Sequence, residues 1–169
     1  VAMVGIISLA PVLGNLLTPV VGPIYSALGA DPAMFATTLL ANDMGGAPLA
    51  LGMAKSPEAG KLAAFILGSM MGPTIVFTIP VALGIIEKED KPFLAKGILA
   101  GITTIPLGVL AGGIVAGFPI GLILVNLIPI IIVAALIILG LIFIPEKMTK
   151  GFEVFGQAVV IIITIGLVA

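Results

Sequence analysis

Long apolar runs separated by short polar gaps constrain this chain more than any other feature. About six such runs can be drawn, over residues 1–28, 33–54, 62–86, 97–117, 120–144 and 152–169. A helix of about 20 apolar residues crosses the ~30 Å hydrocarbon core of a bilayer, and a helix satisfies its own backbone there. The pattern therefore predicts an all-α, polytopic membrane protein with one transmembrane domain over residues 1–169.

Composition agrees with this class and narrows the function. The chain is 60% hydrophobic and 9% charged, whereas soluble domains carry about 25% charged residues. It contains no Cys and no His, which excludes disulfides and removes the commonest general base and metal ligand. Seven lysines scattered among the gaps form no nucleic-acid-binding face. We expect neither an enzyme nor a cofactor.

The apolar runs at both termini suggest a fragment of a longer transporter.

Asp43 lies near the middle of the apolar run 33–54, within the sequence Asn-Asp-Met-Gly-Gly at 42–46. A spanning helix would put it about 15 Å from either face. A carboxylate at that depth is unfavourable by at least ~2.5 kcal/mol and needs a partner or a purpose. The two glycines admit conformations closed to other residues, and Pro48 suits the first turn of a restarting helix. We therefore predict a centrally broken helix.

A second break is predicted in the run 62–86, where residues 68–74 read Gly-Ser-Met-Met-Gly-Pro-Thr. Paired Gly/Pro-interrupted segments are the best sequence indication of a transporter site. If the two segments are antiparallel neighbours, both breaks lie at the same depth. The predicted substrate-binding residues are Asp43, Asn42, Thr37, Thr38, Gly45, Gly46, Ser69 and Thr74. Asp43 would be the counter-charge for a cation. Alternatively, it caps the restarting helix or is protonated.

Four further predictions concern packing and orientation. Asp31 caps the helix that follows it, and Asn126 forms an interhelical hydrogen bond, with substrate binding as the alternative. The G-x-x-x-G pairs let helices approach closely. Five lysines lie in the gaps 87–96 and 145–151 and two in the gap 55–61, so the first face is cytoplasmic if all six runs cross. A re-entrant third segment would instead put all seven lysines on one side.

Two long blocks of the sequence, 36–46 and 67–90, carry a specific resemblance. They read Ala-Thr-Thr-Leu-Leu-Ala-Asn-Asp-Met-Gly-Gly and Leu-Gly-Ser-Met-Met-Gly-Pro-Thr-Ile-Val-Phe-Thr-Ile-Pro-Val-Ala-Leu-Gly-Ile-Ile-Glu-Lys-Glu-Asp. Both resemble the ethanolamine-utilisation membrane transporters, the ethanolamine permease family. The resemblance runs almost continuously over 2–118 and is fainter beyond. It implies a multi-pass protein of the bacterial inner membrane that takes up protonated ethanolamine, by facilitated diffusion.

The expected partners are therefore ethanolamine, the lipid bilayer and, in a homo-oligomer, further copies of the chain. Two alternatives remain at this stage. One is an ion-coupled transporter of another small substrate, in which Asp43 handles the coupling ion. The other is a non-transporting membrane scaffold or receptor subunit, in which the breaks are packing features.

Overall fold

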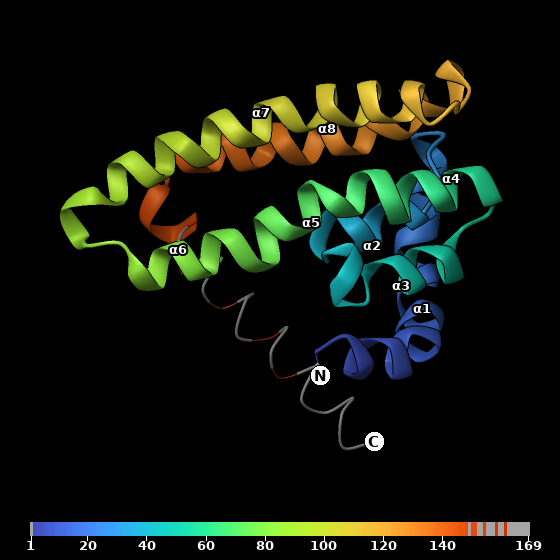
Figure 1. The fold of residues 1–169 in the computed structure, drawn as a ribbon, viewed down its shortest axis with the longest axis horizontal. Helices are drawn as coiled ribbons and strands as arrows, with labels where there is room; N and C mark the ends of the chain where they lie inside the picture. The colour runs from blue at the N-terminus through green and yellow to red at the C-terminus, as the bar shows by residue number, and fades with distance from the viewer. Residues whose placement is uncertain (1, 149, 152–153, 155–157, 159–160, 162–169) are drawn as a thin grey trace.

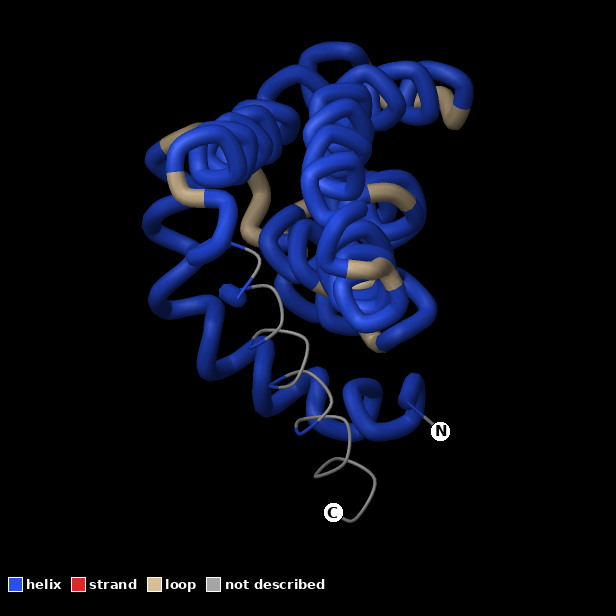
Figure 2. Tube along the Cα trace, turned by 90° about the vertical axis from the view of Figure 1, so that its left-hand side faces the viewer, coloured by secondary structure: helices blue, strands red, loops and turns tan. Residues whose placement is uncertain are grey.

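The computed structural model describes residues 2–148, 150–151, 154, 158 and 161, and over these residues it is helical without a strand (Figures 1 and 2). The all-α prediction is confirmed. The predicted run 152–169 lies almost entirely outside the described residues. The α-helices are α1 (Ala2–Ala27), α2 (Ala33–Leu39), α3 (Gly46–Met53), α4 (Pro57–Lys61), α5 (Met71–Pro73), α6 (Ile79–Ile85), α7 (Lys91–Val115) and α8 (Ile120–Phe143). Between them lie the 3₁₀ turns η1 (Asn42–Met44), η3 (Leu67–Ser69) and η5 (Lys88–Asp90), and the π-helical turns η2 (Leu62–Ile66) and η4 (Thr74–Thr78).

Helices α7 and α8 form a long antiparallel pair (Figure 1). The turn between them uses Gly117 at φ +81°, and the Phe118 N–H donates to the Gly113 carbonyl at 3.0 Å. A left-handed glycine after a helix closes its last carbonyls in this way. Both helices, over Phe93–Val115 and Ile120–Phe143, are long and apolar enough to cross a membrane. They correspond to the predicted runs 97–117 and 120–144.

The third segment is a broken helix, as predicted. Its two parts, Pro57–Ser69 and Met71–Thr78, are bent by 41° relative to each other. The residue between them, Met70, has φ −118° and ψ −67°, far from regular helix. Turns of π-helix on both sides of the break indicate a strained hydrogen-bond ladder. The bend therefore falls within the glycine- and proline-containing stretch 68–74.

The second segment differs from the single crossing that its length suggested. Helices α2 and α3 have 7 and 8 residues, about 10–12 Å each, and they lie side by side as a hairpin (Figure 1). The N–H groups of Lys55 and Ser56, just after the hairpin, donate to the Asp31 carboxylate just before it, at 2.9 and 3.0 Å. The two ends of the α2–α3 hairpin therefore meet, and its tip is residues 40–45.

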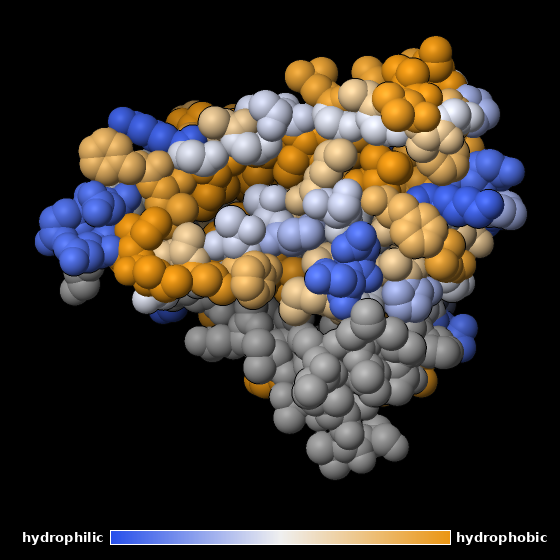
Figure 3. Space-filling model, viewed as in Figure 1, coloured by the Kyte–Doolittle hydropathy of each residue, from blue (hydrophilic) through white to orange (hydrophobic). Residues whose placement is uncertain are grey.

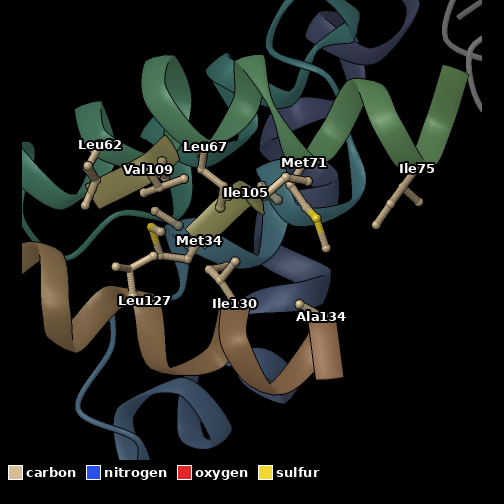
Figure 4. Packing of buried hydrophobic residues seen from close by; sticks show 14 of the residues in the cluster. Met34, Leu62, Leu67, Met71, Ile75, Ile105, Val109, Leu127, Ile130 and Ala134 are labelled. Atoms are coloured by element: carbon tan, nitrogen blue, oxygen red, sulfur yellow. The ribbon is translucent and has the colours of Figure 1, made fainter. Parts of the chain in front are cut away.

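The hairpin is held inside the bundle by an apolar core (Figure 4). Met34 of α2 packs among Leu67 and Met71 of the bent segment and Leu127 of α8, and Met34, Leu67 and Met71 are fully buried. On the other side, Gly14 of α1 approaches Leu49 and Met53 of α3. Large apolar side chains also cover much of the visible surface, while hydrophilic ones gather at the two ends of the long axis and in one smaller patch between them (Figure 3). This distribution suits a protein whose long axis lies along the membrane normal.

Candidate functional site

The two helix breaks lie against each other, although this contact comes from a hairpin and not from the two antiparallel crossings that the depth prediction assumed. A Cβ placed on Gly72 would lie 2.6 Å from the Ala41 nitrogen and still closer to the Leu40 carbonyl oxygen. A Cβ on Gly46 would lie 2.6 Å from the carbonyl oxygens of Leu40 and Ala41. Gly72 therefore lets the backbone of the hairpin tip pack directly on the break of the bent helix, whereas Gly46 lets the tip close tightly on itself.

Asp43 lies at the tip of the hairpin with its side chain exposed. Its N–H donates to the Asn42 Oδ1 at 2.8 Å. Helix α3 begins after Gly45, which has φ +90°, and its start has no side-chain cap hydrogen bond. Within the described residues, the alternative that Asp43 caps the restarting helix therefore finds no support. The carboxylate is left accessible to a cation.

Of the other predicted site residues in the hairpin, two lie against the bent segment and one does not. Thr37 and Asn42 meet at Gly68, where a Cβ would lie 3.0 Å from the Thr37 Cγ2 and 3.1 Å from the Asn42 Cβ. Thr38 is turned elsewhere, because its hydroxyl donates to the Met34 carbonyl at 2.6 Å and also bonds the Tyr25 hydroxyl of α1.

The two polar residues of the bent segment are hydrogen-bonded within it. The Ser69 hydroxyl donates to the Ile66 carbonyl at 2.9 Å, and the Thr74 hydroxyl to the Met70 carbonyl at 2.8 Å. Such bonds back to the preceding turn are common in helices and often accompany bends. Ser69 is exposed and Thr74 is partly buried, so each retains an acceptor oxygen that the internal bond does not use.

Asp31 has a larger role than the sequence indicated. Its carboxylate accepts hydrogen bonds from Ala33 N at 2.9 Å, as expected of a cap, and also from Lys55 N and Ser56 N. Its own N–H donates to Asn126 Oδ1 at 2.8 Å, so Asn126 of α8 bonds to the turn before α2 and not to a neighbouring helix as predicted. Asp31 is only 8% exposed. The proline after Asp31 marks the cap, but its partners 24 and 25 residues away become visible only in the fold.

A hollow of about 360 Å³ opens beside this network at the root of the hairpin. Its polar lining comes from Asp31, Lys55, Ser56 and Asn126, and the Lys55 ammonium donates to the Ser26 hydroxyl. Among the described residues, no group of three or more acidic side chains is gathered as a metal site would require. The charged groups at the hollow are hydrogen-bonded within the protein, whereas the Asp43 carboxylate accepts no hydrogen bond from the described residues.

Comparison with known proteins identifies one family over the whole chain. The family model described as "Ethanolamine utilisation protein, EutH" matches residues 1–169. The chain is 70% identical over 168 residues to the "Probable ethanolamine permease EutH" of Listeria monocytogenes and 56% identical over 181 residues to the protein of the same name from Escherichia coli. It is 55% identical over 168 residues to the "Uncharacterized protein YxeR" of Bacillus subtilis. These alignments cover 99% of the chain and 44–45% of each relative, so the chain spans less than half of their length. No solved structure matches.

Proposed function

Because the chain belongs to the ethanolamine utilisation protein EutH family, we propose that it forms the part of an ethanolamine permease that binds the protonated amine at Asp43. The observation that carries the proposal is the exposed carboxylate at the tip of the α2–α3 hairpin. A charge at such a position in a membrane protein faces a partner or a substrate path. The related proteins named as permeases support transport of ethanolamine.

The chemistry of the tip suits this substrate. Ethanolamine is mostly an ammonium at neutral pH and also carries a hydroxyl. Asp43 offers the counter-charge, and the side chain of Asn42 can both donate and accept a hydrogen bond. No lysine occurs within the hairpin or between residues 62 and 86, so no neighbouring cation along these segments competes for the carboxylate.

We further propose that the hairpin is re-entrant in the bacterial inner membrane, entering and leaving on the same face. Non-helical backbone at membrane depth is tolerated where protein buries it or where it lines a cavity. The lysine-rich gaps 87–96 and 145–151 are assigned to the cytoplasm. The hairpin root and its hollow then face outward, and the tip with Asp43 points toward the membrane interior. A substrate would reach Asp43 from the outer face.

The central test is the Asp43→Asn substitution in the intact permease. We expect it to abolish saturable ethanolamine uptake into proteoliposomes while leaving the amount of inserted protein unchanged, because the amide keeps the shape but not the charge. Glu58→Gln, which neutralises an exposed carboxylate near the hairpin root, serves as the matched control and should transport normally. Normal uptake by Asp43→Asn would overturn the assignment.

The same assay decides between facilitated diffusion and ion coupling. Facilitated diffusion predicts the same initial uptake rate with and without Na⁺ and H⁺ gradients. Uptake that collapses when a gradient is dissipated would instead favour the ion-coupled transporter.

The re-entrant arrangement predicts a specific labelling pattern for single cysteines, since this segment contains none of its own. Ala27→Cys and Glu58→Cys, both at exposed positions on either side of the hairpin, should react with an impermeant maleimide from the same face. Lys147→Cys should react only from the opposite face. A continuous crossing by residues 33–54 would put positions 27 and 58 on opposite faces, and that result would contradict the hairpin.

A further inference from the structure

One buried hydroxyl is left without a hydrogen bond. Thr37 is fully buried in α2, and its Oγ1 has no partner among the described residues. The hydroxyls of Ser26, Thr38, Ser69, Thr74, Thr103 and Thr104 all donate to a carbonyl three or four residues earlier. A buried polar group without a partner destabilises a protein by about 1–3 kcal/mol. Packing alone therefore gives no reason for a threonine rather than a valine at this position.

The location of this hydroxyl connects it to the candidate site. Thr37 and Asn42 both contact Gly68 of the bent segment, and Asn42 directly precedes the exposed Asp43. Gly68 belongs to the 3₁₀ turn η3, between a π-helical turn and the 41° bend. The hairpin thus meets the bent segment at the point where that segment is least regular. Thr37 faces Gly68 through its methyl Cγ2, and its hydroxyl is bonded to the same Cβ. A shift of the hairpin tip away from Gly68 would therefore uncover this side chain next to the tip.

We propose that Thr37 is a specificity-determining residue whose hydroxyl binds the hydroxyl of the substrate once the hairpin tip separates from Gly68. The inference rests on the proposed function, because Asp43 would hold the ammonium of the same molecule. A hydroxyl can donate to or accept from another hydroxyl. A site built to bond a substrate hydroxyl also rejects an analogue that lacks it, because its own polar group then stays unpaired.

This assignment accounts for the missing hydrogen bond. In this structure the Thr37 side chain is fully buried, and its hydroxyl has no hydrogen-bond partner among the described residues. When the substrate hydroxyl reaches it, the Thr37 hydroxyl gains the hydrogen bond that it lacks, whereas an analogue without a hydroxyl leaves it unpaired. Thr38, one position along the helix, is already paired with Met34 and Tyr25, so it is a natural control.

The experiment compares Thr37→Val and Thr37→Ser in the intact permease, with Thr38→Val as the matched control. Uptake of labelled ethanolamine into proteoliposomes is competed with unlabelled ethanolamine and with ethylamine, which has the ammonium but no hydroxyl. For the wild type, the half-inhibitory concentration of ethylamine should exceed that of ethanolamine by at least ~10-fold, and this ratio corresponds to about 1.4 kcal/mol. In Thr37→Val this ratio should fall to about 1 because only ethanolamine binds more weakly. Thr37→Ser and Thr38→Val should keep it.

A second readout separates specificity from a purely structural role. Thr37→Val removes an unpaired buried hydroxyl without changing shape, so its melting temperature should equal or exceed that of the wild type, whereas Thr38→Val should melt lower. The inference is overturned if Thr37→Val keeps the wild-type ratio, or if it weakens both amines equally. If Asp43→Asn transports normally or the wild type takes up no ethanolamine, the proposed function itself fails and this inference with it.

Discussion

Replacing Asp31 by Ala is expected to free the α2–α3 hairpin and to lower the stability of the protein by at least about 4.5 kcal/mol. The buried carboxylate accepts three backbone hydrogen bonds, and bonds to a charged group contribute about 1.5–3 kcal/mol each. The substitution leaves the N–H groups of Ala33, Lys55 and Ser56 without their acceptor. Thermal unfolding in detergent should show a clearly lower midpoint.

Two comparisons make this prediction specific. Asp31→Asn keeps one acceptor oxygen but points an amide N–H toward backbone donors, so it should also destabilise, though less than Ala. Glu58→Ala removes an exposed carboxylate, so its free energy of unfolding should stay within about 0.5 kcal/mol of the wild-type value. An Asp31→Ala protein as stable as Glu58→Ala would show that the network does not hold the hairpin.

Gly72→Ala is the second substitution with a large expected effect. The added Cβ would meet the Leu40 carbonyl and the Ala41 nitrogen, both backbone atoms that have no rotamer to change. Overpacking of well-packed sites usually destabilises by about 1–3 kcal/mol, and we expect this site at or above the upper end. The hairpin tip would have to move off the bent segment.

The matched control is Gly84→Ala in α6, where a Cβ would meet nothing within 4 Å. Alanine is favoured over glycine in a helix by roughly 1 kcal/mol, so this variant should be as stable as the wild type or slightly more so. Both proteins are compared by thermal unfolding in detergent and by ethanolamine uptake. If Gly72→Ala unfolds with the wild-type midpoint, the two breaks do not pack as described.

Much of the architecture follows from local sequence. The apolar runs predict α7 and α8, and the stretch 68–74 predicts the bend in the third segment, because proline and glycine interrupt helices by their own backbone properties. The G-x-x-x-G interpretation holds for Gly68, Gly72, Gly108 and Gly112, which contact neighbouring segments, but Gly97 and Gly101 have nothing within 4 Å. Spacing alone cannot say which face of a helix meets a neighbour.

The candidate site was only partly predictable for the same reason. The sequence treats Thr37 and Thr38 alike, yet a rotation of about 100° per residue turns one toward Gly68 and the other toward Tyr25. Asp31 was recognised as a cap from its neighbour Pro32, but not as the acceptor that joins both ends of the hairpin. Those partners are far along the chain, and no local pattern connects them.

The sequence by itself determined that this is an apolar, all-α chain with two broken segments and one carboxylate within the first of them. The tertiary structure decided that the chain turns back at that carboxylate instead of continuing across. A run of about 20 apolar residues is long enough for one crossing or for two short helices, so its length does not choose between them. The choice is made by the backbone contacts that Gly46 and Gly72 allow at the tip and by the hydrogen bonds of Asp31 at the root.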